Sequence, residues 1–471
     1  MKAKLAIALA LVVALVLGLS YWMGQQKTAR LVAASVPDIP SDGISHPRLQ
    51  ERIQNATTQA NEGSIEGLAE LSKLYDANGF TNEAWQCYAT LVVVEPQDPL
   101  WHYRFGRLLA GYGKLEEATP LFERTIDLDP DYIPARIRLG DTLLKQNRIE
   151  EAEAVYRKTL SLDKKNAYAS VGLGRVEIAR ENWSGAKTHL EKATADSNFQ
   201  IGADLLGDVY EKLGLERQEY QVLETIRWGS YADIPDPWSL DLINDCYDAY
   251  QVSIAGGWVV HQGDSRAGLR YLKRAESLDP DNSTIHFQMA GVYMQMSDLE
   301  EAERHYQRCV ELEPGLADAW LGLMNIAERR QSPTTRRRLL DAALRAAPRS
   351  PSLQIEKGKL MLQQNRVDEA IAAFNRSIEL RPHEAIGYVE LAKAYMSLGR
   401  DEEGIEQIKR AIEKEPNNAI AVSTMAYHSI MNGNQSEAVR WLKRLGELPR
   451  VGRDHLNQLE NAYRRVFGSA P

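Results

Sequence analysis

Apolar and polar residues follow each other along this 471-residue chain in blocks that repeat every 34 residues. In residues 99–132, Trp101 and Phe105 lie at helical spacing, and a second helical pattern runs over 115–128. Pro130 ends that pattern, because the residue before a proline is pushed out of the helical region. Each block is therefore predicted to form two helices joined by a short turn.

Small residues recur at two positions of each block. Position 20 holds Ala84, Ala118, Ala152, Ala186, Gly268, Ala302, Ala370, Gly404 and Ala438, with Arg336 as an exception. Position 8 holds Gly106, Gly140, Gly174, Gly207, Gly256, Ala290, Gly358, Ala392 and Ala426. Because glycine inside a helix costs up to about 1 kcal/mol relative to alanine, its recurrence implies that the two helices cross closely there. A fixed period of this length predicts a stacked array of helix pairs.

An aromatic residue follows the small residue of position 20 by four places in several blocks. These aromatic residues are Tyr88, Phe122, Tyr156, Tyr306 and Phe374. Together with the recurring Glu-Ala step, this pattern resembles the tetratricopeptide repeat (TPR) family over about residues 65–450. The resemblance implies an all-α fold, a right-handed α-solenoid of about ten to eleven helix pairs. It implies partner binding but no particular activity.

The register of the repeat suggests the domain boundaries. Residues 63–228 form a first array of about five units, the last of them degenerate, and 253–450 form a second array of about six. Between them, 82 residues separate Ala186 from Gly268, so we expect an irregular insertion at 229–252. Residues 451–471 are predicted to form a helix that caps the last repeat.

The N-terminus carries a second strong signal. Residues 1–24 contain Lys2 and Lys4 followed by the uncharged stretch 5–23, which is long enough for a transmembrane helix that acts as a signal anchor. A cleaved signal peptide is the alternative, with Gly18 and Ser20 as small residues before the cut. Residues 25–62 then form a tether and a lead-in helix that begins near Pro47. Either interpretation places the array outside the cytoplasm, most simply as a single-pass protein of a bacterial inner membrane facing the periplasm, or as a secreted or periplasmic protein.

Composition argues against catalysis and against nucleic-acid binding. The formal net charge is −9, so no general basic field attracts nucleic acid. The three cysteines form no metal-binding pair, and no nucleotide loop, nucleophile elbow or zinc helix is present. The acidic residues Asp233, Asp236, Asp241, Asp245 and Asp248 lack the spacing of a calcium loop, so we expect them to cap helices and turns. No enzyme activity, cofactor or metal is predicted.

The resemblance also implies which residues line the concave groove. In the family, the ninth and fifth residues of each first helix face it. The residues predicted to bind a partner there are Lys73, Tyr103, Arg107, Arg175, Phe287, Asn325, Lys359 and Lys393. Tyr231 and Trp238 are the predicted contacts from the insertion. A groove lined by basic and apolar side chains suits the binding of an extended peptide that carries acidic residues.

These features together predict a membrane-tethered, non-catalytic scaffold for protein–protein interaction. It would bind an extended protein or peptide partner in its groove, in envelope biogenesis, secretion or assembly. An accessory subunit that binds an anionic polysaccharide for synthesis or export is the alternative.

Overall fold

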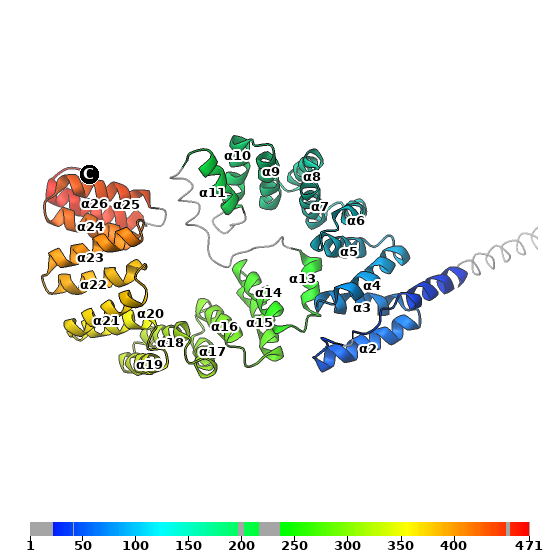
Figure 1. Ribbon diagram of the computed structural model, residues 1–471, viewed down its shortest axis with the longest axis horizontal. Coiled ribbons are helices and arrows are strands. Elements are labelled where there is room, and N and C mark those ends of the chain that lie inside the picture. Colours follow the sequence, from blue (N-terminus) through cyan, green and yellow to red (C-terminus); the bar gives the residue numbers. More distant parts are fainter. Residues whose placement is uncertain (1–21, 41, 196–201, 216–235, 449–452, 471) are drawn as a thin grey trace, which may run out of the picture. The chain divides into compact units, whose positions relative to one another are not determined.

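The computed structural model describes residues 22–40, 42–195, 202–215, 236–448 and 453–470. These residues contain α-helices and turns but no strands, which confirms an all-helical repeat fold (Figure 1). They divide between two compact units, Met1–Leu278 and Asp279–Pro471. Each unit is described by itself.

The first unit contains successive helix pairs. Its helices are α2 (Pro47–Asn61), α3 (Ile65–Ala77), α4 (Thr81–Val94), α5 (Pro99–Gly111), α6 (Leu115–Leu128), α7 (Ile133–Lys145), α8 (Ile149–Leu162), α9 (Ala167–Ala179), α10 (Trp183–Thr194), α11 (Ala203–Lys212), α13 (Pro237–Ile243), α14 (Ala249–His261) and α15 (Ser265–Leu278).

The second unit continues the same pattern. Its helices are α16 (Ser283–Gln295), α17 (Leu299–Leu312), α18 (Ala317–Arg329), α19 (Pro333–Ala346), α20 (Pro351–Gln363), α21 (Val367–Leu380), α22 (Ala385–Ser397), α23 (Asp401–Lys414), α24 (Ala419–Met431), α25 (Gln435–Glu447) and α26 (Arg453–Phe467).

The turn inside each helix pair has a left-handed residue at the same repeat position. Gly113 has φ +76° between α5 and α6, and Asn147 has φ 60° at the matching place between α7 and α8. The left-handed region costs a non-glycine residue roughly 1–2 kcal/mol, so the stacking of the two helices offsets local strain in several repeats.

The small residues lie where the helices of a pair cross, as the sequence predicts. A Cβ atom built on Gly140 would lie 2.5 Å from the Tyr156 ring, and one built on Gly256 would lie 3.1 Å from the carbonyl oxygen of Gly268. Tyr156 is fully buried. The aromatic residue of the second helix therefore fills the space that the glycine of the first helix leaves.

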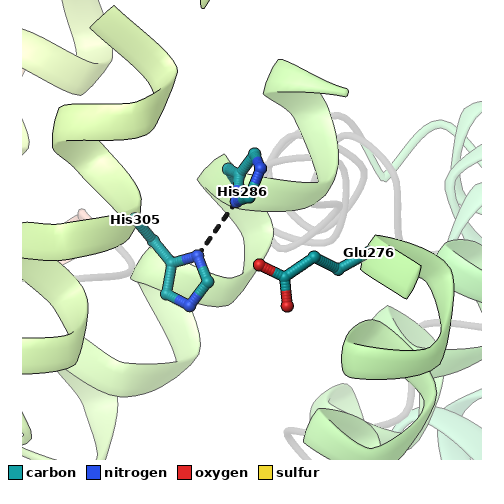
Figure 2. A group of neighbouring side chains, drawn as sticks. All are labelled: Glu276, His286 and His305. Atoms are coloured by element: carbon teal, nitrogen blue, oxygen red, sulfur yellow. Dashed lines mark hydrogen bonds between the residues drawn. The ribbon is translucent and has the colours of Figure 1, made fainter. Parts of the chain in front are cut away.

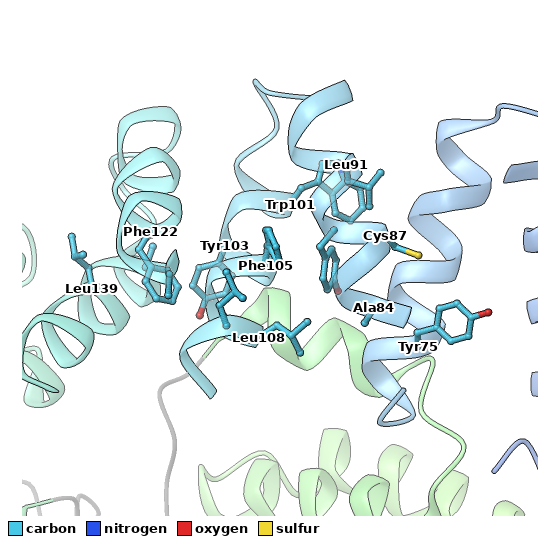
Figure 3. Close-up of a cluster of buried hydrophobic side chains, with 14 of the residues drawn as sticks. Tyr75, Ala84, Cys87, Leu91, Trp101, Tyr103, Phe105, Leu108, Phe122 and Leu139 are labelled. Carbon is cyan, nitrogen blue, oxygen red and sulfur yellow. The ribbon is translucent and has the colours of Figure 1, made fainter. Parts of the chain in front are cut away.

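One cluster of buried side chains extends through much of the first unit, from Val32 to Val176, and Figure 3 shows part of it. Trp85 and Phe105 meet edge to face with ring centroids 6.2 Å apart, and Tyr103 approaches Phe122 at 6.0 Å. Because each layer of side chains contacts only its neighbours, the core extends along the array rather than gathering at one centre.

The N-terminal part differs from a simple extended tether. Residues 22–34 are helical, and Val32 is fully buried. Ala29 lies against the turn at Gly63, so contact with the first repeats orders this segment as a helix. The lead-in helix α2 begins at Pro47, where the sequence predicts it. Most of the expected anchor, residues 1–21, falls outside the described part of the chain. Over the residues that are described, no helix is both long and apolar enough to cross a bilayer.

The last helix, α26, packs against α24 and α25. Leu459 and Tyr463 are buried among apolar side chains of those two helices, including Val422 and Leu442. The apolar side of the final repeat is thus covered by this helix.

Candidate functional site

Within the segment 229–252, which the sequence predicts to be irregular, residues 237–243 form the short helix α13, and α14 begins at Ala249. Asp236 caps α13 by accepting hydrogen bonds from the backbone N–H groups of Trp238 and Ser239, and Pro237 occupies its first turn. An aspartate followed by proline is a helix-start signal, so α13 was detectable in the sequence. Instead of extending the array, α13 contacts α3 and α5 (Figure 1).

The carboxylate of Asp236 is a buried polar group of this contact. Asp236 is 5% exposed, and it accepts a hydrogen bond of 2.5 Å from the hydroxyl of Tyr103 and another from the hydroxyl of Tyr132. Burial, with a further contribution from Asp236, raises the pKa of both tyrosines. Both hydroxyls therefore remain protonated donors at neutral pH, and they compensate a buried charge.

Trp238 lies on two aromatic residues of the repeats. Its ring stacks on Tyr132 with centroids 3.6 Å apart and meets Tyr103 edge to face at 5.5 Å. The guanidinium of Arg104, only 1% exposed, donates hydrogen bonds to the carbonyl oxygen of Trp238 at 2.9 Å and to Asp241 at 3.1 Å. The first helices thus bind this segment through its backbone as well as its side chains.

A second group of contacts holds the end of the segment. The side-chain amide of Asn78 donates to the carbonyl oxygen of Asp245 at 2.9 Å and accepts from the N–H of Tyr247 at 2.7 Å. Arg52 pairs with Asp245 at 2.7 Å. These residues lie on α2 and just after α3, so the segment spans several repeats. We call the set Arg52, Asn78, Tyr103, Arg104 and Tyr132 the covered face.

The five basic residues predicted to line the groove all have carboxylate partners. The pairs are Lys73–Glu70 at 3.1 Å, Arg107–Asp76 at 2.6 Å, Arg175–Asp141 at 3.3 Å, Lys359–Glu356 at 3.0 Å and Lys393–Glu390 at 2.8 Å. Each neighbouring carboxylate offsets the charge that the basic residue would present to an anionic ligand. Whether these residues bind a partner stays a prediction.

The remaining predicted residues have different surroundings. Tyr103 and Trp238 meet each other, Phe287 lies edge to face with Tyr306 at 5.7 Å, and Asn325 accepts a hydrogen bond from Arg329 at 3.0 Å. Tyr231 lies outside the described residues. The structure therefore brings together two of the predicted residues, and both belong to the contact between the insertion and the first array.

Sequence reasoning missed four residues of the covered face: Arg52, Asn78, Arg104 and Tyr132. Arg104 occupies position 6 of its repeat and Tyr132 position 34, whereas the family resemblance pointed to positions 5 and 9. Arg104 lies between the apolar residues Tyr103 and Phe105, and this was a signal that it is buried. A buried guanidinium needs a dedicated partner. Asn78 carried no comparable signal.

A different surface lies on α24 of the second unit. Val422, Met425 and Ala426 bury one side of this helix, yet Ile420, Tyr427 and Met431 on another side are 48%, 51% and 57% exposed. Ile386 holds the same repeat position as Ile420 one repeat earlier and is also exposed. We call Ile386, Ile420, Tyr427 and Met431 the open row. The helix α25, which pairs with α24, is amphipathic, and its charged residues such as Glu437 and Arg440 are exposed.

Two buried histidines of the second unit form a structural contact (Figure 2). Nδ1 of His286 lies 3.0 Å from Nδ1 of His305, and Nε2 of His286 lies 2.9 Å from the carbonyl oxygen of Pro280. Such a pair needs one ring that donates through Nδ1 and one that accepts. The contact joins α16 to α17. Glu276, also drawn in Figure 2, lies in the last turn of α15 in the first unit.

Comparison with known proteins identifies the class. Sequence models described as Tetratricopeptide repeat match residues 109–160 and 260–325, 137–200 and 336–385, and 385–418. The helix pairs, the crossing glycines and these matches agree. The chain belongs to the tetratricopeptide repeat family.

Individual similarities are distant. Among solved structures, yeast Tom70 is 14% identical and covers 85% of this chain and 96% of its own, with a TM-score of 0.41. PilW, described as a widely conserved type IV pilus biogenesis factor, is 18% identical and covers 45% of this chain and 97% of its own, with a TM-score of 0.38. The human protein O-mannosyl-transferase TMTC1 is 22% identical over 160 residues, 33% of this chain. The chain spans only 18% of that relative's length.

Proposed function

We propose that this protein is a non-catalytic scaffold that binds an extended segment of a protein partner along the first helices of its repeats. The observation that carries the proposal is the open row on α22 and α24. Exposed apolar side chains that recur in register mark interaction surfaces. Repeats of this family supply a continuous face on which such a segment can lie.

The chemistry of the open row favours a polypeptide over a polysaccharide. Ile420, Tyr427 and Met431 offer apolar area and one hydroxyl, which suit the side chains of an amphipathic or extended peptide. The basic residues that an anionic glycan would need are paired with carboxylates on the neighbouring turn or repeat. An anionic polysaccharide is therefore the second candidate, and it is tested alongside the first.

The compartment belongs to the same proposal. Lys2 and Lys4 before the uncharged stretch 5–23 support an N-terminal helix in a bacterial inner membrane, with the repeats on the periplasmic side. A role in envelope biogenesis, secretion or assembly follows from such a location. N-terminal sequencing of the protein isolated from its cells tests the anchor, because a start at Tyr21 would show a cleaved signal peptide.

Site-specific cross-linking tests partner binding. A photoreactive p-benzoylphenylalanine is placed at position 427 of the full-length chain in its own cells, and the matched control carries it at position 437 on the charged side of α25. We expect a protein adduct at 427 that is absent at 437, identified by mass spectrometry. The substitutions Ile420→Ser and Met431→Ser should remove that adduct without lowering the melting temperature by more than a few degrees, since both side chains are half exposed.

Two outcomes count against the proposal. Identical adducts at 427 and 437, or none at 427, would contradict a specific protein-binding row. A glycan adduct at 427 without protein would favour the polysaccharide alternative.

A further inference from the structure

The segment 236–247 is held to the covered face mainly by polar and aromatic contacts. Leu242 is the one side chain of α13 that is buried. The other contacts include the hydrogen bonds of Asp236, the stack of Trp238 on Tyr132, and the ion pairs of Asp241 and Asp245. Arg274 of α15 also donates hydrogen bonds to the backbone of this segment, at Ile243 and Cys246. A segment attached in this way resembles a bound peptide more than a core element, because its contacts are those of an interface.

The recognition has a definite pattern. An aspartate meets two tyrosine hydroxyls, the aromatic residue two places later stacks on Tyr132, and a second aspartate, Asp245, pairs with Arg52. Arg104 and Asn78 bind backbone groups of the segment, which any peptide with the same backbone path would supply. The covered face is thus selective for an acidic and aromatic segment.

Arg104 is incompletely satisfied by this segment. Its guanidinium is almost fully buried and bonds through Nη2, whereas Nε and Nη1 have no hydrogen-bond partner within the described part of the chain. A buried polar group without a partner is costly, and a guanidinium binds a carboxylate best through two nitrogens at once. A segment that places a carboxylate against Nε and Nη1 would therefore bind here more tightly than the chain's own residues.

We propose that residues 236–247 are a built-in ligand that occupies a second partner site, and that an acidic and aromatic segment of a partner protein displaces it. This proposal rests on the scaffold function proposed above and adds a regulated site in the first unit. A ligand in the same chain acts at an effective concentration in the mM range for short linkers. With an intrinsic Kd of about 10 μM for the built-in segment, a partner peptide would then bind the occupied site roughly 100-fold more weakly than the vacated one.

Binding of a synthetic peptide to the full-length chain tests the displacement. The probe is a fluorescein-labelled peptide with the sequence of residues 236–248, with serine in place of Cys246, and its Kd is measured by fluorescence anisotropy. Trp238→Ala weakens the built-in ligand while the probe keeps its tryptophan. Trp320→Ala, on α18 of the second unit, is the matched control, since Trp320 is also half buried.

We expect the Trp238→Ala protein to bind the probe at least about tenfold more tightly than the unsubstituted and Trp320→Ala proteins. A probe with alanine and asparagine in place of Trp238 and Asp236 should bind none of them measurably. Equal Kd values for all three proteins, or absence of binding to a Trp238→Ala protein that still melts cooperatively, would overturn the proposal.

Hydrogen exchange on the unsubstituted protein gives a second test that does not depend on a variant. The amide of Leu240 bonds to the carbonyl oxygen of Asp236 within α13, and a helix this short is unstable alone in water. With the unlabelled probe at about 1 mM, the amides of α13 should exchange faster. Unchanged exchange in α13 at saturating probe would contradict displacement.

The two proposals fail separately. Loss of the adduct at position 427 bears on the open row of the second unit and leaves the probe experiment intact. Failure of the probe to bind the Trp238→Ala protein bears on the covered face alone.

Discussion

The covered face of the first unit includes Tyr103 and Arg104 of the first helix α5, and the open row of the second unit lies on the first helices α22 and α24. The two surfaces differ in their chemistry and in whether residues of the same chain cover them. On α5, Tyr103 and Arg104 are buried beneath residues of the same chain. On α24, Ile420 and Tyr427 are about half exposed. This difference shows that the 34-residue pattern controls how the helices stack. The residue types at the other positions of the first helices can differ from repeat to repeat. Similar repeats therefore support two surfaces of different chemistry.

The stacking itself should be equivalent in the two units, and a small residue at position 8 tests this most strongly. We expect Gly140→Ala in the first unit and Gly358→Ala in the second each to lower the free energy of unfolding by about 1–3 kcal/mol. The added Cβ would lie 2.5 Å from the Tyr156 ring in the first case and collide with Phe374 in the second. Urea denaturation followed by circular dichroism measures both.

Gly291→Ala on α16 is the control for this pair. No atom lies within 4 Å of a Cβ built on Gly291, so the substitution should raise the stability by up to about 1 kcal/mol through helix propensity. If Gly140→Ala lowers the free energy of unfolding and Gly358→Ala does not, the two units do not share one mode of packing.

Acid should weaken the first unit more than the second. Burial alone would raise the pKa of Glu70, but hydrogen bonds from Arg52 and Lys73 outweigh it and leave the pKa below its ordinary value. A carboxyl group with a lowered pKa in the folded state stabilises the protein above its unfolded pKa, about 4.3, and that contribution is lost as the pH falls through the folded pKa. Arg52, which pairs with Glu70, also pairs with Asp245, so the contact at the covered face depends on the charge of Glu70.

Glu70→Gln should therefore lower the melting temperature at pH 7 and reduce the further decrease between pH 5 and pH 3. Glu403→Gln in the second unit is the matched control: Arg400 also lowers the pKa of Glu403, but that pair is exposed and screened by solvent. Melting curves at several pH values that are indistinguishable for the two variants would remove this distinction between the units.

The smallest effect is expected at the basic residues of the second unit. Because Lys359 and Lys393 each have a glutamate partner three residues earlier, we expect Lys359→Gln with Lys393→Gln to change the stability by less than about 1 kcal/mol and to leave binding of heparin, a model polyanion, unchanged. Isothermal titration calorimetry measures the binding. A clear loss of heparin affinity would instead support the polysaccharide alternative.

Much of the fold was predictable because the period carries its own physical reason. Ala118, Gly140 and Tyr156 are constrained by close helix crossings that recur every 34 residues, so their spacing predicts the helix pairs and their packing. The lead-in helix at Pro47 and the last helix, α26, also lie where the sequence predicts them. The helix at residues 22–34 was not anticipated, since it is ordered by contact with the turn at Gly63.

The sequence by itself thus determined an all-helical array of tetratricopeptide repeats, because local helix patterns and nearest-neighbour packing specify a solenoid without long-range information. Only the tertiary structure decided which face of the array is covered. Asp236 and Tyr103 are 133 residues apart, and Arg52 and Asp245 are 193 apart. No periodicity links such positions, because their contact depends on where the chain returns after the first array rather than on any local preference.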